Sequence, residues 1–195
     1  AGWSEGGGAA LAIHRLANEN KALGIEITAS APFAGPYNYN RFVTEVLTSN
    51  DAWESMAIYN WSLYTINKYA KNPMKASEIW NYSVENQFDA INVPSNQVTE
   101  ILRSSFIEKI AAGNTSLNEA SIQNTLHKDW HPEGYIYLHS GKADEIVPHF
   151  NSTDAFTTLR SSMNDNIKLY EYEGNHYTPV MNYLFTMLDD FNSLK

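Results

Sequence analysis

The first eight residues, Ala-Gly-Trp-Ser-Glu-Gly-Gly-Gly, constrain the fold of this chain more than any other segment. A serine with a glycine two positions away on each side is typical of a sharp turn, because glycine allows the backbone to approach closely there. Small and apolar residues then recur at helical spacing from Ala9 to Ala17, and Gly24 marks the end of that helix. The segment therefore predicts a tight turn at Ser4 that leads directly into a helix packed closely against a sheet.

Three short apolar segments, near the two ends of the chain, predict strands. They are Ile25–Ser30, Tyr135–His139 and Ile167–Tyr172. Helices are expected from about Asn151 to Ser162 and from Pro179 to about Asn192. Because strands that alternate with helices form parallel sheets, the two ends of the chain together predict an α/β core of about three strands.

The middle of the chain, from 37 to 130, has a mostly helical pattern with no clear strand. We expect four to six helices there, among them 40–49, 52–70, 96–112 and 117–127. Asp51 and Ser116 each begin a sequence typical of a helix capping box. The chain is thus predicted to have three parts: core residues 1–36, a helical cap or lid inserted at 37–130, and core residues 131–195.

The composition excludes several classes of protein. The chain of 195 residues has 22 acidic and 13 basic side chains and a formal net charge of −9, which argues against binding to the phosphates of nucleic acid. It contains no cysteine, so disulfides and a thiolate nucleophile are excluded. No apolar run reaches the roughly 18 residues of a membrane-spanning helix, so no transmembrane segment is predicted.

Ser4 lies at the centre of a G-x-S-x-G pattern, in which the serine is a candidate nucleophile. A serine hydroxyl needs an imidazole to take its proton and a carboxylate to orient that imidazole. Asp144 follows the predicted strand that ends at His139, and His176 follows the one that ends at Tyr172. Because the carboxyl ends of parallel strands meet at one edge of a sheet, we expect Ser4, Asp144 and His176 to converge there.

Four segments together resemble the α/β-hydrolase superfamily, in particular bacterial secreted esterase/lipase-like serine hydrolases and, less specifically, prolyl-oligopeptidase-like ones. They are Gly2–Gly7, Thr28–Tyr37, Gly141–Pro148 and Gly174–His176. The resemblance covers most of the chain and is weakest across the helical insertion. It implies the C-terminal part of an α/β-hydrolase sheet, beginning at the nucleophile elbow.

The resemblance also implies roles for single residues. Ser4 would be the nucleophile, Asp144 the acid and His176 the base, and the backbone N–H of Glu5 would donate to the oxyanion. The second oxyanion donor of the family comes from a loop after an early strand, and this sequence has no such loop. Its absence predicts that the oxyanion hole of this chain by itself is incomplete.

The activity implied by the resemblance is hydrolysis of a carboxylic ester through an acyl-enzyme, with a small-molecule ester or lipid as substrate and no cofactor. The resemblance also implies a secreted or periplasmic location. A peptidase of the same fold is an alternative. Another is an inert fragment that needs a missing N-terminal half. A sheet of about three strands would leave an exposed edge, so self-association or a partner chain that supplies core strands is also predicted.

Several aromatic and histidine residues allow two interpretations. Trp3, Trp53, Trp61 and Tyr177 are candidate substrate contacts, although the aromatic residues from 53 to 82 are first of all expected in a core. The run His127-x-Asp129-x-His131 could suggest a metal, but no third histidine is in register, so no metal site is predicted. His139 lies within a strand and is expected to be a core histidine.

Overall fold

The computed structural model describes residues 1–160 and 165–194. The chain divides into two compact units, one formed by Ala1–Tyr39 with Thr125–Lys195 and the other by Asn40–Asn124. The expected helix from about Asn151 to Ser162 is present as α9, Phe150–Arg160; its last two expected positions lie outside the described residues.

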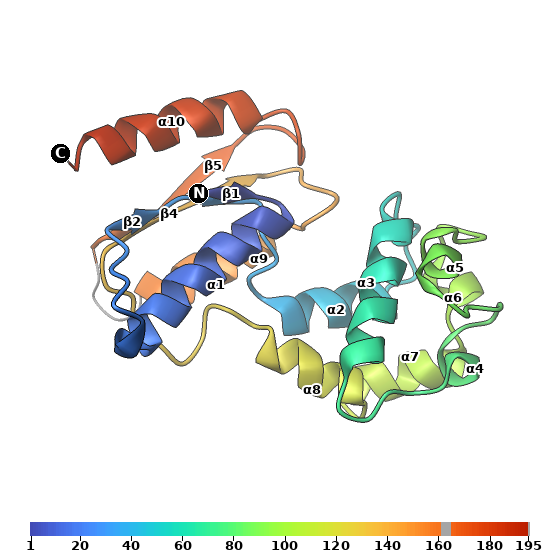
Figure 1. Cartoon of the computed structure of the whole chain (residues 1–195). Coiled ribbons are helices and arrows are strands. Elements are labelled where there is room, and N and C mark those ends of the chain that lie inside the picture. Colours follow the sequence, from blue (N-terminus) through green and yellow to red (C-terminus); the bar gives the residue numbers. More distant parts are fainter. Residues whose placement is uncertain (161–164, 195) are drawn as a thin grey trace. The chain divides into compact units, whose positions relative to one another are not determined.

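The first unit is built on a parallel sheet, whose strands run from blue to orange in Figure 1. Its strands are β1 Gly2–Trp3, β2 Ala29–Ser30, β3 Pro32–Phe33, β4 Tyr135–Gly141 and β5 Ile167–Tyr172. β4 pairs with β2, β3 and β5, and β1 pairs with β3 at the edge. The α/β class with a parallel sheet is therefore as predicted.

The sheet contains two short strands beyond the three that the sequence predicted. The strand expected at 25–30 is reduced to β2, and β3 follows it beyond the predicted end; both pair with β4 in one continuous register. Pro32 has no N–H to donate, so the ladder is interrupted between them. Residues 25–28 are not in a strand, because β4 begins only at Tyr135, opposite Ala29.

Helices cover both faces of this sheet (Figure 1). Alternate side chains of β4 point to opposite faces. On one face, Ile136 and Leu138 pack with Leu11 of α1 and with Leu159 of α9. Helix α1 runs from Glu5 to Glu19. On the other face, Tyr137 packs with Tyr183 of α10, Val180–Asn192. A short 3₁₀ helix, Lys21–Leu23, follows α1.

The hydroxyl of Tyr183 ties α10 to Ala31, the residue between β2 and β3. It donates to the carbonyl oxygen of Ala31 at 2.8 Å and lies 3.5 Å from the carbonyl oxygen of Gly2. The bond is buried, so it is stronger than a comparable bond at the surface. It fixes the helix to the part of the sheet from which Ser4 projects.

The second unit is helical, and its residues, all of them described, form seven helices where the sequence predicted four to six. Its helices are α2 Tyr39–Thr48, α3 Met56–Tyr69, α4 Ala76–Ile79, α5 Gln87–Ile91, α6 Val98–Ile101, α7 Ser104–Ala111 and α8 Ser116–Gln123. Trp80 lies at its centre, where its indole N–H donates to the side chain of the fully buried Asn60 at 2.7 Å.

Two helix boundaries in this unit differ from the sequence prediction. The capping box expected at Asp51 is absent, and α3 begins at Met56 because residues 51–55 form turns and a bridge from Ala52 to Gln97. The helix expected at 96–112 is broken into α6 and α7. At the break, Leu102 pairs with Trp80, which diverts the backbone from helical hydrogen bonding.

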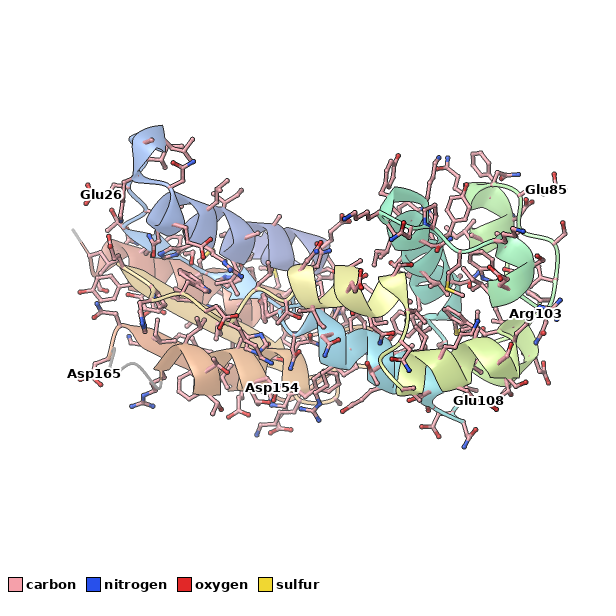
Figure 2. All side chains as sticks on the ribbon, turned by 90° about the horizontal axis from the view of Figure 1, so that it is seen from below. Glu26, Glu85, Arg103, Glu108, Asp154 and Asp165 are labelled. Carbon is pink, nitrogen blue, oxygen red and sulfur yellow. The ribbon has the colours of Figure 1, made fainter. Side chains whose placement is uncertain are left out.

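Charged side chains lie mainly on the outside of both units. Figure 2 labels Glu26, Glu85, Glu108 and Asp165, all of which are exposed. Exposed carboxylates of this kind carry the negative charge at low cost, because they stay hydrated. None of the helices in residues 1–160 and 165–194 has both the length and the apolar character that crossing a membrane requires.

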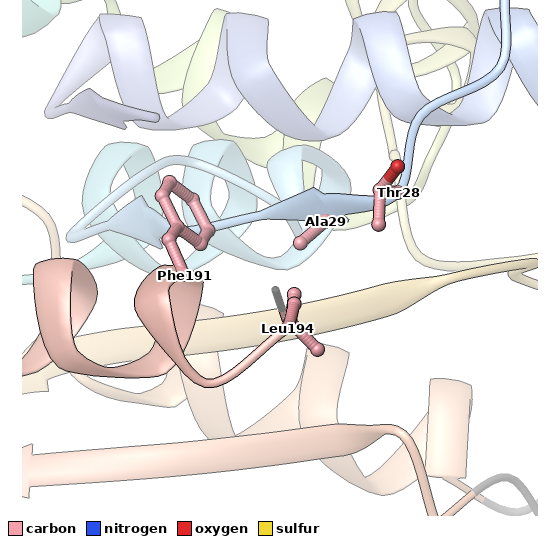
Figure 3. Close-up of a pocket in the computed structure, with 4 residues that line it drawn as sticks. All are labelled: Thr28, Ala29, Phe191 and Leu194. Carbon is pink, nitrogen blue, oxygen red and sulfur yellow. The ribbon is translucent and has the colours of Figure 1, made fainter.

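A small apolar pocket opens at the end of the sheet where β2 begins. It is lined by Thr28, Ala29, Phe191 and Leu194 and has a volume of about 310 Å³ (Figure 3). Ser4, Asp144 and His176 all follow the carboxyl ends of their strands, so this pocket lies at the opposite end of the sheet from them.

Candidate active site

Ser4 occupies the turn between β1 and α1 in a strained backbone conformation. Its φ is 59° and its ψ is −124°, a region that residues with a side chain rarely adopt. Such strain persists only where the surrounding structure enforces it, and it is concentrated at functional sites. The Ser4 hydroxyl makes no capping bond to α1, so it is not used to stabilise the helix.

Glycines allow this turn to form. A Cβ on Gly2 would collide with the carbonyl group of Gly6, so the first glycine of the pattern is required by sterics. A Cβ on Gly7 would lie 2.5 Å from the carbonyl oxygen of Phe33, whereas one on Gly6 would meet nothing within 4 Å. Gly7 therefore sets how closely α1 approaches the sheet.

Glu5 is the first residue of α1. The N–H groups in the first turn of a helix have no acceptor inside the helix, and they carry the positive end of its dipole. The Glu5 N–H is thus placed one residue beyond the Ser4 hydroxyl and is suited to a negatively charged oxygen.

Asp144 lies in the turn that follows β4, and its carboxylate is buried. One oxygen, Oδ1, accepts hydrogen bonds from the backbone N–H groups of Ile146 and Val147 at 2.9 and 2.8 Å. These two bonds fix the orientation of the carboxylate. The other oxygen, Oδ2, is left facing His176.

The imidazole of His176 binds that second oxygen. Nδ1 lies 2.7 Å from Oδ2 of Asp144, and both side chains are almost completely buried. A carboxylate can only accept, so Nδ1 must carry the proton, and in the neutral imidazole Nε2 keeps a free lone pair. This is the tautomer that a general base requires.

The loop that carries His176 is held by its own side chains and by the loop of Asp144. The Asn175 carboxamide oxygen accepts from the N–H groups of Tyr177 and Thr178, both at 3.0 Å. The N–H of Ala143 donates to the Gly174 carbonyl at 2.9 Å. The acid and base loops are therefore tied directly to each other, which favours a fixed distance between them.

Trp3 and Tyr177 lie directly against His176. The rings of Trp3 and His176 have centroids 5.5 Å apart, and the Tyr177 ring meets both edge-on. Trp53 and Trp61 belong to the helical unit, where Trp53 packs against Tyr59 and Trp61 is partly exposed on α3. Contact between substrate and any of the four tryptophan and tyrosine side chains stays a prediction.

A second histidine near the site escaped sequence reasoning. His149 bonds through Nδ1 to the Ser140 hydroxyl at 2.8 Å and through Nε2 to the Glu171 carboxylate at 2.9 Å. It therefore joins the ends of β4 and β5 across the loop that carries Asp144. Its place after Pro148 gave no signal, because Ser140 and Glu171 are brought to it only by the pairing of the two strands.

Three further histidines are buried and have structural partners. His14 lies between the Ser30 hydroxyl and the carbonyl of Glu133. Burial lowers its pKa, although the carbonyl acts in the opposite direction. His139 is fully buried, as expected for a core histidine.

His127 belongs to the run that could have suggested a metal. Its Nδ1 lies 3.1 Å from the Tyr37 carbonyl oxygen, and burial lowers its pKa. Within the ranges that the structure describes, no group of three or more histidine, aspartate or glutamate side chains is arranged to hold a metal ion.

The fold is of the α/β-hydrolase type, as the sequence predicted. The structure is similar to the rice cell wall degrading esterase LipA from Xanthomonas oryzae, with a TM-score of 0.75 and 15% identity over 95% of this chain and 54% of that one. It is similar to a Legionella pneumophila protein provisionally described as a hydrolase, with a TM-score of 0.80 and 17% identity over 98% of this chain and 54% of that one.

Candida antarctica lipase A is also similar, with a TM-score of 0.68 and 14% identity over all of this chain and 48% of that one. The chain thus spans about half the length of the solved structures it matches. No protein-family model matches the sequence, and no curated protein matches it. At sequence identities this low, the structural similarity establishes the fold alone.

Proposed function

We propose that this chain carries the catalytic residues of a serine hydrolase that cleaves carboxylic esters. The observation that carries the proposal is the buried 2.7 Å bond between His176 Nδ1 and Asp144, at the sheet edge to which the strained Ser4 belongs. Two of the similar structures are an esterase and a lipase, which supports an ester as the substrate over other acyl compounds.

In this mechanism, Ser4 Oγ attacks the ester carbonyl carbon while His176 Nε2 takes the hydroxyl proton. The carbonyl oxygen becomes an oxyanion beside the Glu5 N–H. The C–O bond to the alcohol then breaks, and His176 returns its proton to the leaving oxygen. Water, deprotonated by His176, finally hydrolyses the acyl-enzyme and regenerates Ser4. Asp144 keeps the imidazole in the required tautomer throughout.

A fluorophosphonate probe on the purified 195-residue chain tests this directly. We expect one label per chain at Ser4, lost in Ser4→Ala and in His176→Ala. His131→Ala is the matched control, because His131 is exposed, and it should label like the unchanged chain. A folded chain that takes no label would contradict the proposal and favour the inert-fragment alternative.

Assays with ester and amide substrates distinguish the peptidase alternative from the esterase. Turnover of p-nitrophenyl esters without cleavage of aminoacyl p-nitroanilides supports the esterase. Cleavage of the anilides at a comparable kcat/KM would make the peptidase the better assignment.

A secreted or periplasmic location remains part of the proposal and is tested by fractionating cells that produce the protein.

We also propose that part of the first unit associates with another polypeptide, either a second copy or a chain that adds core strands. β1 lies at the edge of the sheet, and α10 exposes an apolar stripe at helical spacing. The stripe consists of Met181, Leu184, Phe185 and Leu188. Exposed apolar patches on one helix face are typical of interaction sites. Sedimentation of the chain as a well-folded monomer at all concentrations would count against this.

A further inference from the structure

Trp3 connects the strand of the candidate nucleophile to the loop of the candidate base. It is the last residue of β1 and directly precedes Ser4. Its indole Nε1–H donates to the backbone carbonyl of His176 at 3.2 Å, across 173 positions of sequence. The two rings are also in contact, with an interplanar angle of 34°.

Tyr177 completes a cluster of three rings. Its ring lies edge-on to Trp3 at 5.7 Å and to His176 at 5.3 Å. Trp3 and Tyr177 are 38% and 54% exposed, while His176 is 2% exposed. The two outer rings therefore contribute to the burial of the imidazole.

The His176 loop has contacts on two sides. On the acid side, Gly141 packs so closely that a Cβ there would lie 2.5 Å from the Asn175 carbonyl oxygen, and Ala143 bonds to Gly174. On the nucleophile side, Trp3 supplies the hydrogen bond. Without this bond, the loop would still be tied to Asp144, but only ring contacts would join it to the strand that sets the position of Ser4.

We propose that Trp3 is a positioning residue: its indole N–H fixes the His176 loop relative to Ser4. The inference rests on the proposed function and assigns Trp3 a role other than the substrate contact expected from the sequence. A misplacement of about 1 Å in reacting groups costs roughly 10²-fold in rate, and loss of one neutral hydrogen bond allows smaller shifts. We therefore expect a loss of about 10-fold in kcat when this bond is removed.

Trp3→Phe keeps an aromatic ring and removes the N–H. Trp130→Phe is the matched control, because the indole of Trp130 also donates to a backbone carbonyl, that of Leu126 at 2.8 Å, in a core away from the site. Two readouts are compared: kcat and KM for a p-nitrophenyl ester, and amide hydrogen exchange of residues 174–178.

Trp3→Phe should lower kcat about 10-fold with KM changed less than about 2-fold, and should speed exchange in the 174–178 loop about 10-fold. Trp130→Phe should change neither. Replacing Trp3 by benzothienylalanine, in which sulfur stands in place of the indole N–H, repeats the test with the ring shape kept.

Unchanged kcat and unchanged exchange in Trp3→Phe would overturn the inference, as would an equal loss of kcat in Trp130→Phe. A change in KM alone would assign Trp3 to substrate contact instead. If the unchanged chain neither labels nor turns over, the proposed function fails. The exchange readout then still decides whether Trp3 holds the loop.

Discussion

The stability of this protein should fall between pH 7 and pH 5 because of His139. This histidine lies in β4 with no exposed surface, stacked on Tyr170 with ring centroids 4.8 Å apart. Its Nδ1 is 2.8 Å from the Tyr172 hydroxyl, and its Nε2 has no hydrogen-bond partner among the residues that the structure describes. A second proton on this ring would therefore be buried without an acceptor, which is costly.

The size of the effect follows from the pKa. Burial lowers the pKa of His139 from 6.5 to about 4, and the negative charge of Asp190 offsets only part of this. At pH 5 an unfolded histidine is about 97% protonated and His139 in the fold about 9%, so the unfolded state binds more protons and stability rises with pH. Integrated over pH, this difference in bound protons lowers the free energy of unfolding by about 2 kcal/mol between pH 7 and pH 5. The total loss below pH 4 is about 3 kcal/mol.

The measurement is urea unfolding at pH 7 and pH 5 for the unchanged chain and for His139→Phe, which keeps an aromatic ring and cannot titrate. Loss of the bond to Tyr172 lowers the stability of the variant at both pH values, so the pH dependence isolates the proton. The unchanged chain should lose about 2 kcal/mol more than the variant. The contributions of the other histidines cancel in this comparison.

A difference below about 0.5 kcal/mol would refute the reasoning, because it would correspond to a pKa close to that of an exposed histidine. Proton NMR of the imidazole gives an independent answer. A titration midpoint for His139 above pH 6 would contradict the burial argument.

Three other predictions concern the parts that hold the site. Gly7→Ala should destabilise the protein by about 1–3 kcal/mol in thermal unfolding, because its Cβ would meet the Phe33 carbonyl, whereas Gly6→Ala has free space and should be neutral or stabilising by up to about 1 kcal/mol. Equal effects would contradict the close approach of α1. Tyr183→Phe should cost about 1 kcal/mol by losing its buried bond, and a neutral result in urea unfolding would argue against that bond. His149→Gln should slow fluorophosphonate labelling by a few-fold, since one of its two bonds is lost near the acid loop; a rate unchanged from the parent would exclude that role.

The sequence by itself determined the class of fold and the residues that follow each strand. The glycines around Ser4 predict a strand-to-helix turn, and at Gly2 and Gly7 a larger residue would collide with the backbone. Asp144 and His176 could be chosen because each follows an apolar strand-forming segment. Local patterns of this kind depend on backbone sterics and on side-chain periodicity, which act over a few residues.

Tertiary structure alone decided the features that depend on pairing between distant segments. β1 and β3 are two residues long, too short to leave a pattern, and exist because a neighbouring strand supplies their hydrogen bonds. The break between α6 and α7 likewise comes from Trp80, more than 20 residues away.

The same distinction holds at the candidate site. The sequence placed His176 and Asp144 at one sheet edge, but only the folded chain determines that Nδ1 faces Oδ2 and that the other carboxylate oxygen is held by backbone N–H groups. The indole of Trp3 bonds to the loop of His176, a contact that no sequence pattern indicated, and its expected contact with substrate stays a prediction. Which partner a side chain takes depends on groups that the chain brings together only when the sheet has formed.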